Sequence, residues 1–325
     1  MHIFIIMPAY DVADFIATAI ESVLAQTHRD WTLVVIDDGS TDATADIAAR
    51  FADPRLRLVR QRNAGVSAAR NRGLGALGTE SGGAVMFLDA DDWLAPDALA
   101  RLAATLAAAP EAVAAYGAHC FVAENGRTRT ATKAGPFAEG DILERLLVQN
   151  QFANGGHVLI RAAAVRRLVG FRSDLRYGED WEFWCRLAAL GRFAAVPGPA
   201  PLLFVRQRAN GAVLRLAGNP RTFRPCMDAV FGNPDLIARL GAPRVAALRR
   251  QAEAENRWII GRELIRHGRR PEGLGWLRRS VLRRPRPHRL LLLAAAHALP
   301  LLPPPLRGPF RRYHTGLTQM AGQVN

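Results

Sequence analysis

The sequence predicts an α/β fold with a mostly parallel, doubly wound, Rossmann-like sheet and an α-helical C-terminal extension. The main observation is that short, continuously apolar runs alternate with segments of helical periodicity through residue 108. Such runs suit strands that are covered on both faces, as in parallel sheets. A second observation is that the chain becomes Arg-rich and helical beyond residue 206. With 325 residues, 49% of them hydrophobic, the chain is long enough for one large domain and an appendage, or for two domains.

The first part of the chain shows this alternation most clearly. The expected strands are residues 3–7, 32–36, 56–60 and 84–88. The expected helices are residues 12–26, a segment capped by Ser40-Thr41-Asp42 that runs to about Phe51, residues 66–77 and residues 96–108. Apolar residues recur at helical spacing in the first of these helices, and Pro96 suits the first turn of the last.

The rest of the chain is less regular. The expected strands are residues 113–123, 157–161 and 194–205, and the expected helices are residues 139–149, 162–168 and 179–191. A helical hairpin is expected from residues 244–267 and 271–283. We therefore expect one domain in residues 1–210 and a basic helical extension in residues 211–325.

The charge of the chain is unevenly distributed. Residues 1–200 hold 20 Lys and Arg against 23 Asp and Glu, a net charge of −3, and residues 201–325 hold 23 against 6, a net charge of +17. These values sum to the +14 of the whole chain. Such asymmetry indicates a basic face that meets something anionic. Because Lys133 is the only lysine, the bias toward arginine also indicates GC-rich coding.

The cysteines and the N-terminal segment indicate a reducing compartment and the cytoplasm. Cys120, Cys185 and Cys226 are widely scattered, without a C-x-x-C pair or the spacing of a metal site. MHIFIIMPAY lacks the basic start and the cleavage site of a signal peptide. No run reaches 18 apolar residues, so a spanning helix is not expected.

Polar residues follow three of the expected strands, at residues 8–11, 37–40 and 89–92. The carboxyl ends of parallel strands meet at one edge of a sheet, and ligands of open α/β sheets bind there. We therefore expect these segments to lie along one rim that forms a binding site.

The segment MFLDADDW places Asp89, Asp91 and Asp92 directly after a buried strand. Such a cluster is costly unless a cation neutralises it, and oxygen ligands select Mg²⁺ or Mn²⁺. D-x-D at this rim therefore predicts a site for a metal ion and a diphosphate. The structural alternative is capping of the following helix by Asp92 or Asp97, which leaves Asp89 and Asp91 unexplained.

Two further segments have competing interpretations. The Asp38 carboxylate can accept hydrogen bonds from a base or a ribose, or Asp37-Asp38-Gly39-Ser40 can simply form a turn before a capped helix. Gly73-Leu74-Gly75-Ala76-Leu77-Gly78 matches G-x-G-x-x-G but closes an expected helix instead of opening one. We reject a dinucleotide site there and expect these glycines to end the helix and let it pack closely.

Four ordered motifs then give the chain a clear resemblance. They are IIMPAYDVADFIATAIESVLAQTHRDWTLVVIDDGSTDAT, NAGVSAARNRG, FLDADDWL and GEDWEFWCRLA. Together they resemble the family 2 glycosyltransferases, which are inverting enzymes with the A-type nucleotide-sugar fold. The resemblance covers roughly residues 1–210. It implies a donor-binding half in residues 1–110, an acceptor half in residues 111–210, and a nucleotide-diphosphate sugar, a UDP-sugar in the first instance, as donor.

The resemblance also assigns donor-side residues. Those expected at the base and ribose are Pro8, Ala9, Tyr10, Asp38, Arg70 and Asp89. Asp91 is expected to hold the metal ion, Mg²⁺ or Mn²⁺, with Asp92 as a secondary candidate. The chain departs from the family at Asp11, where relatives commonly carry Asn, so the fine detail of the base pocket is open.

On the acceptor side, the resemblance makes Asp180 the catalytic base, with Glu179 as its competitor. An inverting transfer needs one base to take the proton of the acceptor hydroxyl, so a single carboxylate in this place makes chemical sense. His157 is expected either at the donor phosphate or acceptor or as a hydrogen-bonded strand histidine. Arg206 is expected either at the diphosphate or in a surface salt bridge.

The C-terminal segment 286–325 combines arginines with a short apolar run. Residues 290–302 are too few to span a bilayer, and basic residues around them suit an interfacial anchor on an anionic membrane at the cytoplasmic face. The alternative is a terminal helix packed on the catalytic domain. Nucleic-acid binding is not expected, because aromatic residues are sparse and the segment matches no known module.

These features favour a metal-dependent glycosyltransferase acting on a glycan or lipid-linked acceptor in surface polysaccharide biosynthesis. One alternative is a sugar nucleotidyltransferase, which would carry a Gly-rich, basic loop after the first strand in place of Pro8-Ala9-Tyr10. The other is a catalytically inactive scaffold that binds membranes. The presence of Asp38, Asp89, Asp91 and Asp180 argues against this loss of activity.

Overall fold

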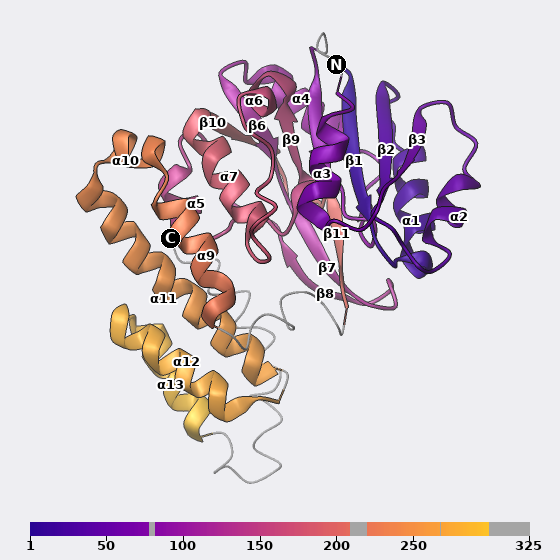
Figure 1. Ribbon diagram of the computed structural model, residues 1–325. Coiled ribbons are helices and arrows are strands. Elements are labelled where there is room, and N and C mark those ends of the chain that lie inside the picture. The colour runs from indigo at the N-terminus through magenta and orange to yellow at the C-terminus, as the bar shows by residue number, and fades with distance from the viewer. Residues whose placement is uncertain (78–81, 209–219, 267, 299–325) are drawn as a thin grey trace. The chain divides into compact units, whose positions relative to one another are not determined.

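The computed structural model describes residues 1–77, 82–208, 220–266 and 268–298 (Figure 1). The chain divides into two compact units. The first comprises Met1–Leu146 and Asn150–Ala209, and the second comprises Leu147–Gln149 and Asn210–Asn325. The functional halves expected within the first unit stay a prediction.

A large, mostly parallel sheet forms the centre of the first unit. Its strands lie in the order β10-β6-β9-β4-β1-β2-β3. Their bounds are β1 Ile3–Ala9, β2 Trp31–Asp37, β3 Leu56–Arg60, β4 Ala84–Phe87, β6 Ala112–Tyr116, β9 Val158–Arg161 and β10 Arg192–Ala195. Only β9 runs antiparallel to its neighbours β4 and β6 among the described strands of this sheet. The predicted α/β class with a mostly parallel sheet is confirmed.

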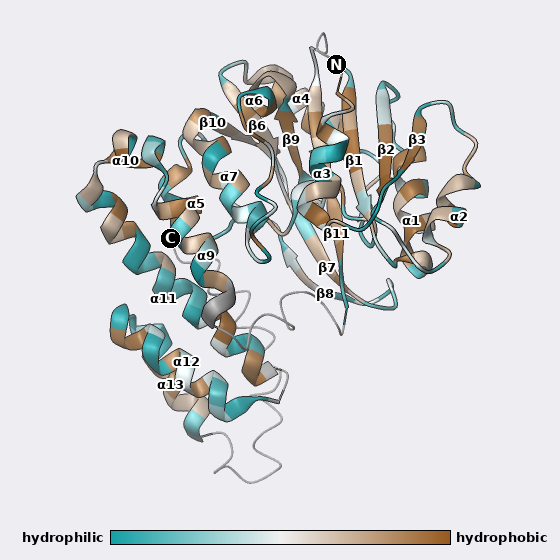
Figure 2. Cartoon of the chain, in the orientation of Figure 1, coloured by the Kyte–Doolittle hydropathy of each residue, from teal (hydrophilic) through white to brown (hydrophobic). Residues whose placement is uncertain are grey.

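The continuous apolar runs are explained by burial on both faces of this sheet. In β2, Leu33 and Val35 join a large core with α1 (Ala13–Leu24) and α4 (Ala98–Ala108). Val34 and Ile36 point to the other face and pack with Ala69 of α3 (Val66–Leu74). Figure 2 shows these strands as predominantly hydrophobic. Because successive side chains of a strand alternate between faces, a strand covered on both sides has to be apolar throughout.

Several helix ends differ from the expected ones by a few residues, among them the start of α5 at Leu143, where residue 139 was expected. The remaining helices of the first unit are α2 Thr44–Ala49, α5 Leu143–Val148, α6 Ala162–Arg166, α7 Glu179–Leu190 and the 3₁₀ turn η1 Gly155–His157. The expected cap at Ser40-Thr41-Asp42 is right only in part, because α2 starts later with Ala43 at its cap position, whereas Asp42 Oδ1 accepts a hydrogen bond from Thr44 N at 2.9 Å. The predicted helix 66–77 ends at Leu74, and a Cβ on Gly73 would lie 2.4 Å from Ile6 Cγ2. This close contact agrees with the packing role expected of these glycines; Gly78 lies outside the described residues.

Two predicted strands are each split between two sheets. A smaller sheet has the order β5-β11-β7-β8, with β5 Trp93–Leu94, β7 His119–Ala123, β8 Arg129–Lys133 and β11 Leu203–Gln207. The predicted strand 113–123 breaks at Gly117, where a Cβ would lie 2.8 Å from Leu202 Cδ1. The predicted strand 194–205 breaks at Pro197-Gly198-Pro199-Ala200-Pro201, because proline lacks the N–H that a central strand needs. In both cases the chain leaves the large sheet and enters the small one.

The second unit is helical, as the sequence predicted. Its described helices are α9 Pro220–Phe231, α10 Pro234–Leu240, α11 Ala242–Arg266, α12 Arg270–Arg283 and α13 Pro287–Ala298. Helices α11 and α12 form the expected hairpin, with Gly273 directly against the backbone of Gly261. Trp258, Leu277 and Val281 make a small core, against which Leu292 and Leu293 of α13 pack. No helix in the described ranges is long and apolar enough to cross a membrane.

Candidate active site

The three polar segments lie along one edge of the large sheet. Strands β1, β2 and β4 are parallel neighbours, with Ala9 opposite Asp37 and Ile6 opposite Phe87. Residues 8–11, 37–40 and 89–92 therefore leave adjacent strands at the same end. The rim expected from the sequence is present in the structure.

Pro8, Ala9 and Tyr10 end the first of these strands. Pro8 and Ala9 are buried in β1, whereas Tyr10 is 48% exposed. Next to it, Asp11 has a positive φ of 47°, a conformation that Asp and Asn tolerate better than most residues. The Asp11 carboxylate accepts a hydrogen bond from Thr41 N at 2.7 Å. This bond joins the segment after β1 to the segment after β2 and leaves the Tyr10 ring accessible.

Asp38 is buried and holds a neighbouring loop. Its carboxylate accepts hydrogen bonds from Gln61 Nε2 at 2.7 Å, Ala64 N at 2.9 Å and Gly65 N at 2.8 Å. Gly39 has φ +74°, and a Cβ there would lie 2.7 Å from the backbone N of residue 63. Asp38 therefore shapes the loop that leads into α3, whatever it contributes to a ligand.

Arg70 is enclosed between two carboxylates. Its side chain is only 7% exposed and donates to Asp89 Oδ1 at 3.0 Å and to Glu179 Oε1 at 3.2 Å. The sequence predicted Arg70 near the nucleotide. In the structure its guanidinium joins the end of β4 to the first turn of α7.

Asp180 follows Glu179 in the first turn of α7. Its carboxylate accepts hydrogen bonds from Asn150 Nδ2 at 3.2 Å and from Trp181 N at 2.7 Å. Burial, together with the Glu179 charge, raises the pKa of Asp180 to about 7, and Arg70 opposes this rise. A carboxyl group with this pKa exchanges protons near neutral pH, as a general base must.

Asp91 has a cationic partner that the sequence analysis missed. Arg208 Nη1 lies 3.3 Å from Asp91 Oδ2. Burial and the charge of Asp89 raise the pKa of Asp91, and Arg208 lowers it in part. The only signal for Arg208 in the sequence is its place just after a strand, two residues beyond Arg206.

Arg206 contacts backbone carbonyls and aromatic rings, and its expected approach to the diphosphate stays a prediction. It donates from Nε to the carbonyl of Asp91 at 3.1 Å and from Nη1 to the carbonyl of Glu124 at 2.6 Å. Its guanidinium lies 4.7 Å from the centre of the Phe15 ring and 4.9 Å from that of Trp93. Arg206 thus supports the backbone of the D-x-D segment through carbonyl and aromatic contacts.

Asp92 and His157 are both taken up by internal contacts. Asp92 is buried and accepts hydrogen bonds from Asn154 Nδ2 and, at 2.7 Å, from Arg206 N, so it does not cap a helix. Burial raises the pKa of Asp92 well above its ordinary value. His157 is fully buried, with Nδ1 2.9 Å from Gly117 O and Nε2 accepting from Ala153 N at 3.1 Å. These contacts favour the structural alternative for His157.

Comparisons with known proteins show the family to which this chain is related. The sequence profile described as Glycosyl transferase family 2 matches residues 4–169. Succinoglycan biosynthesis protein ExoO of Rhizobium meliloti is 32% identical over 223 residues, which covers 65% of this chain and 63% of that protein. Glycosyltransferase GlyA of Streptococcus pneumoniae is 41% identical over 95 residues, 29% of this chain and 13% of that protein. This chain therefore spans less than two thirds of the length of either relative.

Solved structures with the same architecture include two with nucleotide-sugar donors. S. aureus TarS 1–349 in complex with UDP-GlcNAc matches with a TM-score of 0.65 at 17% identity. The match covers 92% of this chain and 88% of the TarS chain. The mannosyltransferase PcManGT from Pyrobaculum calidifontis, in complex with GDP-Man and Mn²⁺, matches with a TM-score of 0.56 at 20% identity. This match covers 99% of the present chain and 85% of the PcManGT chain. These matches confirm the expected A-type fold.

Proposed function

Because this chain belongs to glycosyl transferase family 2, we propose that it transfers a sugar from a nucleotide-diphosphate sugar to a hydroxyl group of a glycan or lipid-linked acceptor, with inversion. A UDP-sugar is the first donor to test, as in the TarS complex. Surface polysaccharide biosynthesis is the proposed process, since the names of relatives refer to succinoglycan and teichuronic acid biosynthesis. The observation that carries the proposal is Asp180, a carboxyl with a pKa of about 7 beside the D-x-D rim.

In this proposal Asp180 acts as the base. It accepts the proton of the acceptor hydroxyl while that oxygen bonds to the anomeric carbon and the bond from this carbon to the diphosphate breaks. Asn150 and the backbone N–H of Trp181 orient the carboxylate through their hydrogen bonds. Glu179 is less suited to the role, because its carboxylate is already paired with Arg70.

One carboxylate at the rim suits a divalent cation, although the described residues contain no group of three or more His, Cys, Asp or Glu side chains that could hold a metal ion. Asp91 offers carboxylate oxygens, the ligand type of Mg²⁺ and Mn²⁺, and a neighbouring positive charge is favourable there, as the pairing with Arg208 illustrates. Asp91 would therefore hold the ion together with phosphate oxygens of the donor. The bound ion would supply positive charge to stabilise the diphosphate leaving group.

The nucleotide is assigned to the segments after β1 and β2. Tyr10 is accessible for stacking on the base. Pro8 and Ala9 precede Tyr10 in the sequence and form the end of β1. Asp38 holds residues 61–65 in place and would form the wall near the base or ribose. Asp89, 28% exposed, would contact the ribose, and Arg70 would act on the nucleotide through Asp89.

Nucleotide binding tests this function and its alternatives. Calorimetric titrations with UDP, GDP and dTDP, each with and without Mn²⁺, should give Mn²⁺-dependent binding of one nucleotide. Asp91→Ala should abolish the metal dependence, whereas Asp97→Ala, a control at an exposed carboxylate, should retain it. Absence of binding by every nucleotide would overturn the proposal and favour the inactive scaffold. Formation of a nucleotide-sugar from a sugar phosphate and a nucleoside triphosphate would favour the nucleotidyltransferase.

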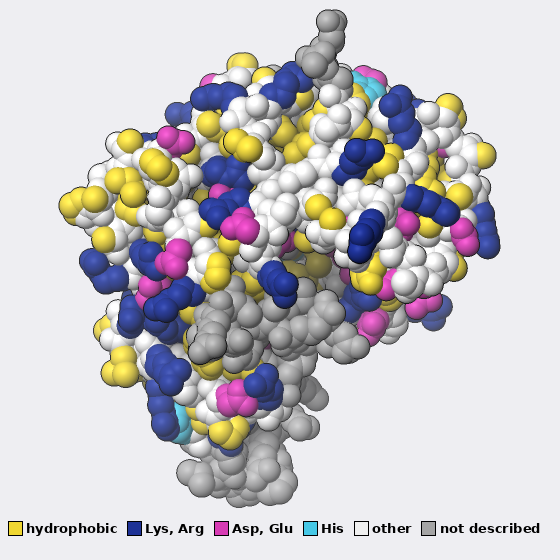
Figure 3. Space-filling view, viewed as in Figure 1, with side chains coloured by type: hydrophobic (Ala, Val, Ile, Leu, Met, Phe, Trp, Pro, Cys, Tyr) yellow, Lys and Arg dark blue, Asp and Glu magenta, His cyan; other side chains and the backbone are white. Residues whose placement is uncertain are grey.

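The second unit is proposed to bind an anionic lipid surface at the cytoplasmic face of the membrane. Leu282 is 84% exposed at the end of α12, and Leu290 and Leu291 are 50% and 72% exposed near the start of α13. Arg283 and Arg286 lie between them in the sequence and are both accessible. We call these five residues the basic–apolar corner. Figure 3 shows several dark blue side chains over this unit, which are arginines because the unit contains no lysine. The expected tail arginines and prolines beyond residue 298 lie outside the described residues.

Exposed leucines beside arginines fit the boundary between anionic headgroups and acyl chains. Sedimentation with vesicles rich in phosphatidylglycerol should therefore exceed that with phosphatidylcholine vesicles, and should fall at high salt. Leu290→Ser with Leu291→Ser should reduce it at least several-fold. Ile237→Ser, on α10, is the matched control. Unchanged sedimentation of the double variant, or of a chain without residues 286–325, would refute membrane binding through this corner.

A further inference from the structure

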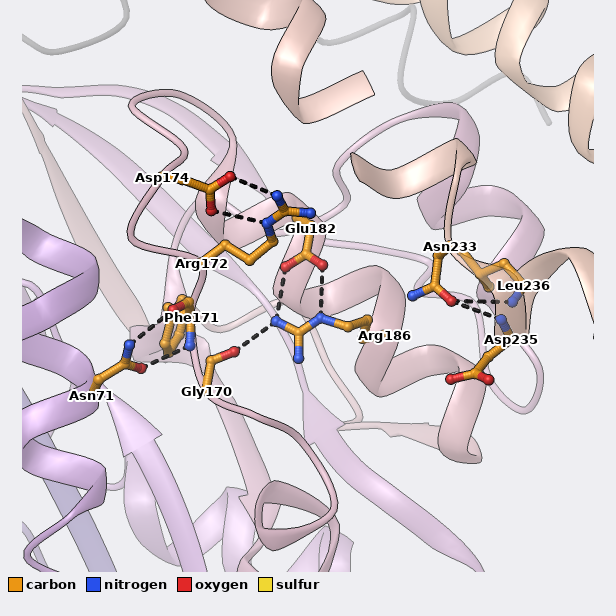
Figure 4. A network of polar contacts seen from close by, with 10 residues as sticks. All are labelled: Asn71, Gly170, Phe171, Arg172, Asp174, Glu182, Arg186, Asn233, Asp235 and Leu236. Carbon is orange, nitrogen blue, oxygen red and sulfur yellow. Dashed lines mark hydrogen bonds and ion pairs between the residues drawn. The ribbon is translucent and has the colours of Figure 1, made fainter. Parts of the chain in front are cut away.

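Arg70 and Asn71 of α3 both hold the start of α7 and the segment that leads to it. Arg70 is bonded to Glu179, the first residue of α7. Asn71 Nδ2 donates to Phe171 O at 2.8 Å, and Phe171 N donates to Asn71 Oδ1 at 2.7 Å (Figure 4). The Arg70 guanidinium also lies 5.1 Å from the centre of the Phe171 ring. Two consecutive residues of one helix therefore attach residues 171–179 to the donor side of the site.

The same segment is attached from α7 itself by a separate contact. Arg186 donates to Glu182 at 2.7 Å and to the carbonyl of Gly170 at 2.6 Å (Figure 4). Gly170 has φ +78°, and a Cβ there would lie 2.5 Å from Asn71 Oδ1. This second ion pair holds the segment at its other end and does not involve Asp180.

The buried charge of Arg70 requires partners on both sides. Its side chain is almost fully enclosed, and Asp89 and Glu179 are the carboxylates that it contacts. Removing the guanidinium would leave two partly buried carboxylates facing each other without a cation. The distance between the end of β4 and the start of α7 is therefore maintained by Arg70.

We propose that Arg70 is a positioning residue for the transfer reaction, which joins Asp89 on the donor side to Glu179 on α7 and so holds Asp180 in place and sets how readily it takes up a proton. This inference rests on the proposed function, in which Asp180 is the base. It adds a role for the Arg70–Glu179 pair that the nucleotide contact expected from the sequence does not include.

The charges around Asp180 predict the direction in which each variant shifts the pKa of Asp180. Glu179 on α7 and Asp89 after β4 raise the pKa of Asp180, and Arg70 on α3 lowers it. Asn150, which also contacts Asp180, is uncharged. Loss of the Glu179 charge should therefore lower the pKa of Asp180, and loss of the Arg70 charge should raise it. Opposite shifts from the two partners of one ion pair would show that their charges act on Asp180 in addition to their packing.

The decisive experiment is a carbon NMR titration of the Asp180 carboxyl in the full chain, assigned with Asp180→Asn. Glu179→Gln should lower the midpoint and Arg70→Gln should raise it, each by about one pH unit. Arg70→Lys, which keeps the charge, should lie near the wild type. Arg186→Gln, which removes the other buried ion pair of α7, should leave the midpoint unmoved. The acidic limb of the pH profile of kcat should move in parallel with each midpoint.

Shifts of the same sign, or no shift in Glu179→Gln and Arg70→Gln, would overturn the proposal. If Arg70→Gln does not fold, Glu179→Gln and Arg70→Lys decide the outcome. In both of these variants the cation at position 70 keeps Asp89 as its partner, so both should fold. The titration needs no substrate. A wild-type chain without sugar transfer would contradict the proposed function, whereas a failed titration would contradict the role of Arg70 even in an active enzyme.

Discussion

The two units of the molecule both bury charged side chains, but the excess charge has opposite signs. At the rim of the first unit carboxylates outnumber arginines. The carboxylates are Asp89, Asp91, Asp92, Glu179 and Asp180, and the paired arginines are Arg70 and Arg208. In the second unit arginines outnumber carboxylates. Glu253 and Glu255 are surrounded by Arg249, Arg257, Arg283, Arg284, Arg286 and Arg289.

The second cluster pairs its charges within its own helices, although Arg257 Nη1 and Arg289 Nε are buried without a hydrogen-bond partner among the described residues. Arg289 of α13 pairs with Glu255 of α11, and its guanidinium lies 5.0 Å from the centre of the Trp258 ring. Ser280 of α12 donates to Ala254 O at 2.7 Å and accepts from Arg289. Glu255 therefore ties α13 to the α11–α12 hairpin. The arginine excess beyond it is accessible at the surface, where it favours an anionic partner.

In the first cluster each carboxylate has a hydrogen-bond partner, but the carboxylates outnumber the arginines. Burial raises the pKa values of Asp91, Asp92 and Asp180, which shows that their negative charges are held at a cost. Burial also lowers the pKa values of Arg257, Arg284 and Arg289, so both clusters hold buried charge at a cost. The comparison thus sets a carboxylate-rich rim, at which we propose a cation and a diphosphate, against an arginine-rich cluster that holds helices together.

The largest effect is expected from Asp180→Asn. It should lower kcat about 10³-fold, because the amide cannot take the proton of the acceptor hydroxyl. Asp174→Asn, which changes an exposed carboxylate paired with Arg172 (Figure 4), should remain within about twofold of the wild type. A decrease in kcat of less than tenfold in Asp180→Asn would mean that Glu179 is the base. It would also contradict the catalytic role given to the carboxylates of the first unit.

The next largest effect concerns the second unit. Glu255→Gln should lower the free energy of unfolding of this unit by about 3 kcal/mol, because buried Arg289 then lacks its counter-charge. Hydrogen exchange in α11–α13 would report the change. Glu272→Gln, at an exposed pair with Arg269, should change it by less than about 0.5 kcal/mol. Equal effects of the two variants would mean that the Glu255 cluster does not hold α13 in place.

Two glycines of α12 separate packing from helix propensity. Gly273→Ala should destabilise the second unit by about 2 kcal/mol, since its Cβ would lie 2.6 Å from the carbonyl of Gly261. A Cβ added at Gly275 would have no heavy atom within 4 Å, so Gly275→Ala should stabilise α12 by about 0.5–1 kcal/mol. Thermal unfolding of both variants tests this. Stabilisation by both would show that the close helix contact is not required.

The smallest effect is the contribution of Asp180 to the pH dependence of the first unit. An acid whose pKa is raised on folding stabilises the native state below its ordinary pKa, and this contribution is lost as pH rises through the raised value. The buried imidazoles of His119 and His157, whose pKa values burial lowers, give a slope of the opposite sign, so the contribution of Asp180 is the difference between the wild type and Asp180→Asn. This difference in the unfolding free energy of α7 should fall by about 1 kcal/mol per pH unit between pH 5.5 and 7, because the window of Asp180 ends near pH 7. Exchange in α12 should not differ between the two proteins at any pH, because Asp180 belongs to the first unit.

Much of the fold and part of the site are readable from the sequence alone. Continuously apolar strands such as residues 32–36 have to be buried on both faces. This pattern is typical of a parallel sheet with helices packed on each side. Polar segments after those runs have to meet at one edge. The D-x-D pair stands out for that reason, because two carboxylates at the end of a buried strand are costly unless a cation neutralises them.

Pairing across long sequence distances had to come from the tertiary structure. It decided that Arg70 joins Asp89 to Glu179, that Arg208 and not Arg206 reaches the Asp91 carboxylate, and that both ring nitrogens of His157 are bonded within the core. It also split residues 113–123 and 194–205 between two sheets. Local sequence patterns specify burial and backbone preference, whereas the partner of a charged side chain depends on which elements the sheet topology makes neighbours.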